Sequence, residues 1–511
     1  MSKLGQERDA GSRIRFESQT TSCFADPMTS SVWISNQRVA SIVILLAVFM
    51  TNLDLWIVNV ALPAIGSSFA SSAGGAATLS SLSWVLNAYA IALAALLVVA
   101  GRLGDRIGQR PVFLAGVTLF TLASLACAVA PDLGTLVAAR ALQAVGAAAQ
   151  LPTSLALLLA SVPAEHRTRA TRNWAAVGGL AAAAGPVAGG LLVQVDWRWV
   201  FVINVPIGIA TVAAGLRVLP STARREEGRL PDLAGAVLIT LAIAALSGAL
   251  VQAPDWGWLD ARSLTLFVLA LAGAAAFVRR SLRHRHPLFE LPLLRLPQFG
   301  AASAGTFAFG IAFAIMLLSN VLWCQEIWHW SALRTGVAMV PGPALVPVVT
   351  VLTARAAQRL GHGPLVTAGG LLFAAAMLWR TCFASLDADY WLDLLPSQVL
   401  GGVGVGLTLG TLVAAGVSSL PGHRAATGSA LVNSVRQMSA TVGVALLVAV
   451  VGTHVGPAQQ PDFRVAWVVA AALSVATAVI GVRITRGART REAAPPTQTP
   501  AAPLTEGAAG Q

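Results

Sequence analysis

Long apolar runs alternate with short polar segments along most of the 511-residue chain. About fourteen of these runs approach the roughly 20 residues that an α-helix needs to cross a bilayer. The predicted spans are 40–65, 82–101, 111–130, 135–160, 173–194, 199–219, 233–252, 263–279, 299–323, 335–353, 364–384, 395–419, 427–452 and 465–483. The pattern predicts an all-α polytopic membrane protein, with polar tails at 1–38 and 485–511 that we expect to be disordered.

Composition and charge agree with this class. The chain is 56% hydrophobic and 11% charged, with a mean hydropathy of +0.72 and a net charge of +12. The positive charges fall in short clusters between apolar runs, which indicates cytoplasmic loops of a multi-pass protein of the cell membrane and no nucleic-acid partner. The four cysteines have no metal-ligand or redox spacing, so no metal site is predicted.

The distribution of charge along the chain predicts its topology. Most of the 34 basic residues fall in alternate polar segments, which predicts an even number of crossings and cytoplasmic N- and C-termini. The predicted outer segments keep Arg198, Arg262, Arg334, Arg380 and Arg464, and Arg140 and Arg436 lie in or near spans. The predicted outer loops hold the acids Asp132, Asp196, Asp255, Asp260, Asp387, Asp389, Asp393 and Asp462. Of the 22 acids, Asp54 alone is predicted well inside a span, and Glu326 lies at the outer end of the ninth.

Two loops indicate an internal duplication. GRLGDRIGQRPV, from Gly101, aligns with ARAAQRLGHGPL, from Ala354, so that Gly108 matches Gly361 and Pro111 matches Pro364. Repeated units of this kind are common in secondary transporters. We expect two six-helix bundles related by pseudo-two-fold symmetry, at 39–219 and 299–484, and a linker at 220–298 that holds two additional transmembrane helices.

Asp54 is the first candidate for chemistry. A carboxylate near the middle of a span costs roughly 2.5–3.5 kcal/mol on insertion scales, so it marks a functional site by default. Burial disfavours its charged form, as a proton carrier requires. Arg140 and Gln143 share one face of a later helix, and Asp54 is a candidate counter-charge for Arg140. Two alternatives stay open: Asp54 as a purely structural acid, and Arg140 snorkelling to the outer surface.

The loop at Gly101 resembles the signature loop of the major facilitator superfamily, G-x-L-a-D-r-x-G-r-K/R, with Gly104 and Gln109 as departures. The resemblance implies a conformational switch in which Asp105 helps to latch the two halves in the outward-facing state. The other switch residues that it implies are Gly101, Arg106, Gly108 and Arg110. An ordinary basic loop that only sets topology is the alternative. The second copy has Gln358 in place of the acid, so a latch there would be weaker.

Four further strings resemble the fourteen-helix drug:proton antiporter branch of this superfamily, which includes bacterial multidrug and antibiotic resistance exporters. The first is LDLWIVNVALP, in which Trp56 replaces the usual threonine. The others are SWVLNAYAIALAAL, GGLAAAAGPVAGGLL and DWRWVFVINVPIG. The helix with Arg140 resembles a further pattern of the family, R-x-x-Q-G-x-G. The resemblance implies proton coupling by Asp54 and Arg140. It implies a substrate cavity with Trp56, Asn59, Tyr89 and Gln143, and a gating helix with Gly185, Pro186, Gly189 and Gly190.

The favoured function is proton-coupled efflux of an amphipathic small molecule or antibiotic by alternating access. A dedicated exporter of a self-made antibiotic, another secondary metabolite, a siderophore or a lipid is the alternative within the same fold. An enzyme is not expected, because no His, Asp and Glu cluster at one depth of the membrane. The expected partners are a small-molecule substrate, protons and the lipid bilayer. We expect a monomer without a cofactor, driven by the proton motive force.

Overall fold

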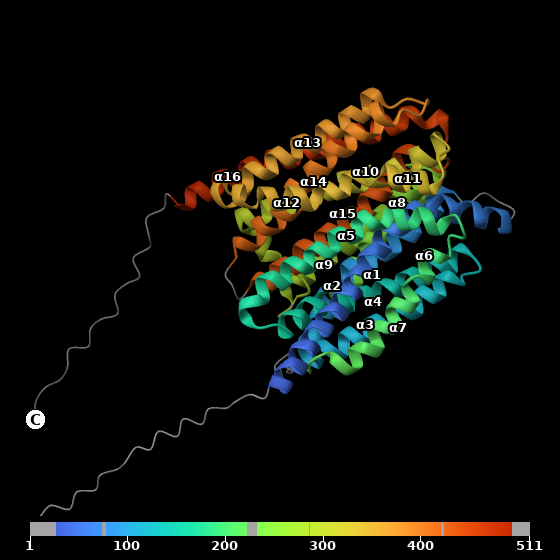
Figure 1. Cartoon of the computed structure of the whole chain (residues 1–511). Coiled ribbons are helices and arrows are strands. Elements are labelled where there is room, and N and C mark those ends of the chain that lie inside the picture. The colour runs from blue at the N-terminus through green and yellow to red at the C-terminus, as the bar shows by residue number, and fades with distance from the viewer. Residues whose placement is uncertain (1–26, 74–77, 222–231, 286, 421–423, 493–511) are drawn as a thin grey trace, which may run out of the picture.

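The computed structural model is a bundle of helices that run side by side (Figure 1). The structure describes residues 27–73, 78–221, 232–285, 287–420 and 424–492. Fourteen helical segments in these residues are long and apolar enough to cross a membrane, and this part of the chain contains no strand. The predicted all-α polytopic class is therefore confirmed. Most of the two predicted tails, residues 1–26 and 493–511, lies outside the described residues.

The first half follows the predicted spans closely. It comprises α1 (Pro27–Ala73), α2 (Leu79–Ile107), α3 (Gln109–Ala128), α4 (Leu133–Ala160), the 3₁₀ turn η1 (Ala164–His166), α5 (Arg167–Val193), α6 (Trp199–Val202) and α7 (Asn204–Val218). Two details differ from the expectation. Helix α1 begins inside the segment predicted as a tail, and the sixth span is interrupted at Ile203, so that it forms α6 and α7.

Two inserted helices and a second half follow. They comprise α8 (Leu233–Trp256), α9 (Ala261–Arg283), η2 (Leu291–Arg295), α10 (Pro297–Leu322), the π-helical turn η3 (Trp323–Ile327), α11 (Ala332–Ala338), α12 (Pro341–Leu360), α13 (His362–Phe383), the π-helical turn η4 (Tyr390–Leu394), α14 (Leu395–Ser418), α15 (Ala425–Val451), η6 (Pro457–Gln459) and α16 (Gln460–Glu492). The start of α1 and the end of α16 lie at the same end of the bundle (Figure 1), as an even number of crossings requires. The cytoplasmic location of that end stays a prediction.

The two repeated loops have the same backbone geometry. Gly108 joins α2 to α3 with φ 112°, and Gly361 joins α12 to α13 with φ 79°. Both residues donate their backbone N–H to a carbonyl four residues earlier, which ends the first helix of each pair. A positive φ is strained for residues with a side chain, so glycine is needed at both turns. The alignment made from the sequence therefore matches equivalent positions in space.

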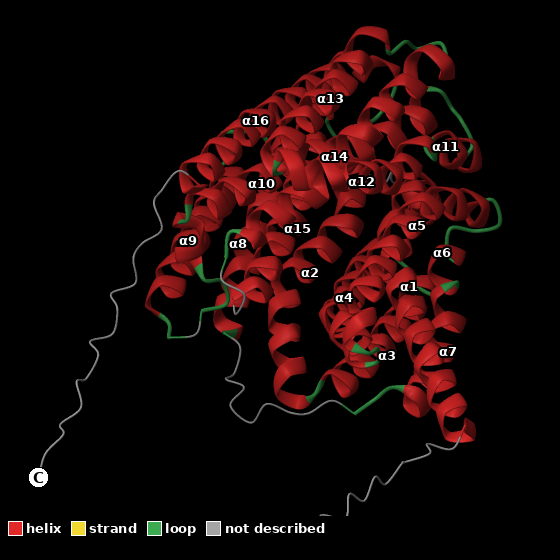
Figure 2. Cartoon of the chain, turned by 60° about the vertical axis from the view of Figure 1, so that its left-hand side comes forward, coloured by secondary structure: helices red, strands yellow, loops and turns green. Residues whose placement is uncertain are grey.

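The two halves meet at the predicted outer end (Figure 2). There α5 of the first half packs on α11 of the second, and the Gln325 side chain donates a hydrogen bond to the Val60 carbonyl at 3.0 Å. The start of α2 also reaches the end of α15, because the backbone N–H of Leu79 donates to the Thr453 carbonyl at 2.8 Å. Asp255 of the inserted α8 accepts from the hydroxyls of Ser80 and Thr453. The inserted pair is thus attached to both halves.

Toward the predicted cytoplasmic end, α5 and α12 become more exposed. Gly185, Pro186, Gly189 and Gly190 of α5 are buried, whereas most residues of its first turns, between 167 and 176, are exposed. The last three turns of α12, residues 350–360, are exposed in the same way. Helix α5 is therefore closely packed toward the predicted outer end, and both helices are more exposed toward the other end.

Candidate functional site

The candidate site is centred on Asp54, halfway along the membrane-spanning part of α1, which extends over Gln37–Phe69. The Asp54 side chain is 0% exposed. Its carboxylate accepts hydrogen bonds from Arg140 Nη1 at 2.5 Å, Gln143 Nε2 at 2.9 Å and Asn204 Nδ2 at 3.1 Å. These donors come from α4 and α7, so three helices of the first half converge on one acid.

Arg140 is as deeply buried as its partner, with 1% exposure. Its Nε donates to the Val85 carbonyl at 3.2 Å, and its Nη1 donates also to Gln143 Oε1 at 2.6 Å. The guanidinium lies 4.2 Å from the centroid of the Tyr89 ring, a cation–π contact that offsets part of its desolvation. The interpretation of Arg140 as a side chain that snorkels to the surface is therefore wrong, and its pairing with Asp54 is confirmed.

Local sequence places Arg140 at this depth. Helix α4 begins at Asp132, whose carboxylate caps it by accepting from the Thr135 backbone N–H and hydroxyl, both at 2.8 Å. These hydrogen bonds hold the pKa of Asp132 below its usual value. Two turns later Arg140 and Gln143 share the face turned toward α1, because residues three apart are neighbours on a helix.

Two members of the site were not predicted as site residues. Ser124 of α3 accepts from Gln143 at 2.7 Å and from Asn204 at 3.4 Å, and both it and Asn204 are buried. We call Asp54, Ser124, Arg140, Gln143 and Asn204 the Asp54 cluster. Asn204 stood in the DWRWVFVINVPIG string, where it could have been noticed as a polar residue in an apolar span. Ser124 carries no such signal.

Asp54 is the titratable group of the cluster, and its role as a proton carrier stays a prediction. Protonation of Asp54 would neutralise the carboxylate and remove the counter-charge of Arg140 in a region shielded from water, where charge interactions are strong. The side chains of Gln143 and Asn204 would remain as neutral hydrogen-bond partners. The same contacts would also satisfy a purely structural acid, so geometry alone is compatible with both interpretations of Asp54.

The other predicted cavity residues have different surroundings. Trp56, half-buried, points away from the Asp54 cluster and contacts Phe313 of α10 in the second half, with 5.8 Å between ring centroids. Asn59 donates to the Leu55 carbonyl within α1, and Tyr89 covers Arg140. Helix α1 therefore presents the acid to its own half and an aromatic ring to the other half, within one turn.

The switch residues of the loop at Gly101 lie apart from the Asp54 cluster. Asp105 accepts a hydrogen bond from Gln109 of the same loop at 2.9 Å, and within the described residues it forms no ion pair. Arg110 donates to the Leu216 carbonyl at the end of α7, at 2.5 Å, and Arg106 is exposed. Gly101 packs near Pro152 of α4. Among the described residues, Asp105 therefore forms no hydrogen bond or ion pair with the second half, and its role as a latch stays a prediction.

Helix α5 has two close-packed faces at its predicted gating motif. A Cβ on Gly185 would lie 2.4 Å from Trp56 Cβ, and one on Gly189 would lie 2.9 Å from the Ile57 carbonyl oxygen. Gly190 and Pro186 instead approach the backbone of α11, where a Cβ on Gly336 would lie 2.0 Å from the Pro186 oxygen. The small residues thus bring α5 against α1 on one side and against the second half on the other.

A second buried ion pair lies in the second half and corrects the sequence interpretation. Arg380 of α13 and Asp393 of η4 were predicted in outer loops, yet they are 0% and 1% exposed and bonded to each other. Trp323, Trp328 and Trp467 surround the guanidinium, with ring centroids 4.6–5.9 Å away. Asp393 is thus a second acid inside a span, because the helical segment Tyr390–Ser418 starts before the apolar run does.

Removing one partner of this pair should strongly destabilise the fold. Asp393→Asn would leave the Arg380 charge buried without a counter-charge, at a cost of about 3–5 kcal/mol in the free energy of unfolding. The expected result is a strongly lowered unfolding midpoint of the purified protein in detergent. The matched control is Asp387→Asn, an exposed acid of the same loop, which should change stability by about 0.5 kcal/mol or less. Equal effects of the two substitutions would contradict a structural role for the pair.

Arg436 is a further charged residue inside a span. It lies near the middle of α15, which packs on α2, α8, α10, α14 and α16, and its side chain is solvent-accessible although protein surrounds it. Within the described part of the chain its guanidinium has no hydrogen bond or ion pair. Asn433 and Gln437, on the same side of α15, are partly exposed. Asn433, Arg436 and Gln437 therefore form a polar stripe along α15.

No metal site was predicted, and the described residues contain no group of three or more His, Cys, Asp or Glu side chains close enough to hold a metal ion. Glu326, whose role the sequence left open, is half-buried in η3 near the predicted outer end. It lies in a different half from the Asp54 cluster.

Comparisons with known proteins agree on one family. The family model of the Major Facilitator Superfamily matches residues 44–444. The chain is 32% identical over 423 residues to the multidrug resistance protein Stp of Mycobacterium tuberculosis, covering 82% of this chain and 76% of that protein. It is 34% identical over 402 residues to the methylenomycin A resistance protein of Streptomyces coelicolor, covering 78% and 82%. It is 33% identical over 412 residues to the tetracenomycin C resistance and export protein of Streptomyces glaucescens, covering 80% and 75%.

The solved structures support the fold. The peptide-transporter-family protein PepTSo superposes with a TM-score of 0.64 at 14% identity, over 88% of this chain and 98% of that one. At this identity the likeness concerns the fold alone. The fourteen candidate spans and the resistance proteins among its relatives identify the chain as a multi-pass membrane transporter. This agrees with the resemblance found in its motifs. The chain belongs to the major facilitator superfamily.

Proposed function

We propose that this transporter exports an amphipathic small molecule or antibiotic across the cytoplasmic membrane in exchange for protons. The observation that carries the proposal is the Asp54–Arg140 ion pair, fully buried at mid-span beside the interface between the halves. An acid in this position is costly and is retained in membrane proteins chiefly where it moves protons or ions. The names of the relatives, which describe resistance to and export of antibiotics, support a drug-like cargo.

The proton and the cargo would use different faces of α1. Asp54 faces α4 and α7 inside the first half, whereas Trp56 faces Phe313 across the interface. Loss of the ion pair on protonation would free α1 to shift against α4, and Trp56 and the α1–α5 contact would shift with it. Coupling then results because α1 contacts both the proton site and the cargo surface, and the proton and the cargo each favour a different access state.

The structure in hand fits one step of this cycle. Asp54 accepts from three donors, and its ion pair with Arg140 is intact. In the proposed cycle, an intact ion pair belongs to the step in which the carrier holds no proton and is ready to take up cargo. Trp56 and the polar stripe of Asn433, Arg436 and Gln437 are candidates for the surface that cargo meets.

The alternative, a dedicated exporter of a self-made antibiotic or other metabolite, is favoured by a different observation. Two of the relatives, both from Streptomyces species, are named for resistance to a single antibiotic. Such a protein would use the same proton cycle with a narrower cargo surface. The two proposals differ in breadth of cargo and share their mechanism.

Transport by the purified full chain in proteoliposomes tests both proposals. With an acidic lumen, the lumen stands for the outside, and ethidium or puromycin added externally should accumulate inside. Each proton moved through 100 mV contributes about 2.3 kcal/mol, which corresponds to a roughly 50-fold concentration ratio of cargo. A protonophore should abolish the accumulation. Cargo accumulation that is the same with and without the pH gradient would contradict proton coupling. Transport of one antibiotic class alone would favour the dedicated exporter.

A further inference from the structure

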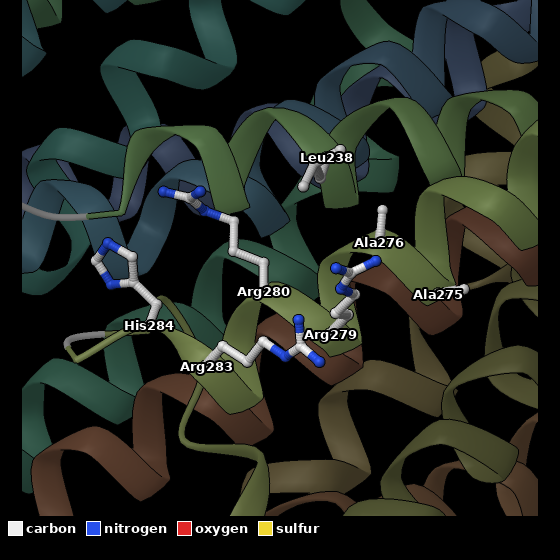
Figure 3. Close-up of a pocket in the computed structure, with 7 residues that line it drawn as sticks. All are labelled: Leu238, Ala275, Ala276, Arg279, Arg280, Arg283 and His284. Carbon is white, nitrogen blue, oxygen red and sulfur yellow. The ribbon is translucent and has the colours of Figure 1, made fainter.

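A cavity of about 660 Å³ lies between the two inserted helices, α8 and α9, away from the Asp54 cluster. Figure 3 shows its walls: Leu238 from α8 on one side, and Ala275 and Ala276 from α9 together with the basic side chains on the other. The basic side chains are Arg279, Arg280, Arg283 and His284. It is open to the surroundings over much of its surface, so a ligand there would be only partly enclosed.

Two of the four basic groups are available for a ligand. Arg280 Nε donates to the buried carboxylate of Asp232 at 2.7 Å, so this side chain is held in place across the two helices. Arg279 and Arg283 are exposed, and the described part of the chain provides no ion pair or hydrogen bond for either guanidinium. They lie four residues apart, one turn along the same face of α9. The cavity therefore combines one anchored and two free guanidinium groups.

The position of the cavity indicates where its ligand comes from. The basic side chains lie at and just after the end of α9, at the end of the bundle where Arg102 of the predicted cytoplasmic loop donates to the Pro287 carbonyl at 2.9 Å. The wall with Ala275 and Ala276 continues into exposed apolar residues of the same helix, among them Leu271 and Val278. Charge at the helix end and an apolar surface above it match the two parts of a phospholipid.

We infer that this cavity binds an anionic phospholipid of the predicted cytoplasmic leaflet, with the phosphate between Arg279 and Arg283 and an acyl chain along α9. Arginine suits this role because its planar guanidinium donates two parallel hydrogen bonds to phosphate oxygens. Basic pockets between membrane helices on the cytoplasmic side recognise lipid headgroups in this way. The inserted helix pair, which touches both halves, thereby acquires a lipid-dependent contact. The inference needs only the membrane location and is independent of the cargo.

Titration of dioleoyl phosphatidylglycerol into the purified full chain, in a non-ionic detergent, tests the site. Each arginine near an anionic headgroup is expected to contribute about fivefold to affinity, so Arg279→Gln/Arg283→Gln should weaken binding roughly 25-fold. The matched control is Arg355→Gln/Arg359→Gln, which removes two exposed arginines from the end of α12 without touching the cavity. Binding of dioleoyl phosphatidylcholine should be weak for all three proteins.

Further measurements separate the possible outcomes. Arg279→Lys/Arg283→Lys should retain only part of the affinity, because the charge remains but the two parallel hydrogen bonds of each guanidinium are lost. The unfolding midpoints show whether each variant is folded. If inorganic phosphate binds with an affinity equal to that of the lipid, the acyl chain contributes nothing, the site is a phosphate site and the lipid assignment is overturned. Equal losses of lipid affinity in Arg279→Gln/Arg283→Gln and Arg355→Gln/Arg359→Gln would show that general surface charge, and not this site, binds the lipid. Unchanged binding in Arg279→Gln/Arg283→Gln would overturn the inference directly.

Discussion

Replacing Asp54 by asparagine is expected to abolish cargo accumulation driven by the pH gradient. The substitution removes the titratable group of the Asp54 cluster and leaves Arg140 buried without its counter-charge. Accumulation in proteoliposomes should fall from a roughly 50-fold ratio per coupled proton at 100 mV to a ratio near one. The same change should lower the free energy of unfolding by about 3–5 kcal/mol, because an uncompensated charge stays in the interior.

A double substitution separates the loss of transport from the loss of stability. Asp54→Asn/Arg140→Gln removes both charges, so the unfolding midpoint should recover toward that of the wild type while uphill transport stays absent. The two residues are in contact, and their effects on stability should therefore be strongly non-additive. Asp54→Glu retains a carboxyl group and should keep pH-driven transport at a reduced rate. Normal gradient-driven accumulation by a folded Asp54→Asn protein would remove this acid from the mechanism.

The second large effect is expected from Gly336→Ala on α11. The added Cβ would lie 2.0 Å from the Pro186 carbonyl oxygen of α5, a backbone atom that cannot rotate away. Overpacking of this kind costs about 1–3 kcal/mol, which corresponds to a roughly 5- to 150-fold shift between the two access states. The variant should therefore open the contact between α5 and α11 at the predicted outer end and slow transport by a similar factor.

Spin labels can measure this shift directly. Labels at Val195 and Leu386, exposed residues at the predicted outer end of the two halves, should report a longer-distance population in Gly336→Ala in a cysteine-free background. Gly410→Ala on α14 is the matched control, since a Cβ there meets no atom within 4 Å. An unchanged distance distribution in Gly336→Ala would show that this contact does not set the access state.

Much of the fold could be predicted because the cost of crossing a bilayer depends on local sequence. A run of about 20 apolar residues is readable without knowledge of its neighbours, and for this reason the predicted spans agree with the helices of the structure. Pairing between helices is not readable in this way. Arg380 and Asp393 ended apolar runs and were therefore placed in loops, although in the structure each is the buried counter-charge of the other.

The Asp54 cluster shows the same division between local and tertiary information. Asp54 could be selected from the sequence because one acid in an apolar run is costly wherever it lies. Ser124 could not be selected, since a serine satisfies its hydroxyl easily within a helix and costs little. The orientation of Trp56 toward Phe313 depends on which side of α1 meets α10, and hydropathy along α1 does not record that.

By itself, the sequence determined a membrane-spanning helical protein with a duplicated loop and one conspicuous acid, because hydrophobic length, glycine at strained turns and isolated charge each act within a few residues. Only the tertiary structure decided that this acid is turned into its own half, that a second ion pair is enclosed by tryptophans, and that α5 and α11 close one end. Each of these features depends on contacts between segments far apart in the chain. The free energy of such a contact depends on both segments, so neither segment's sequence alone predicts it.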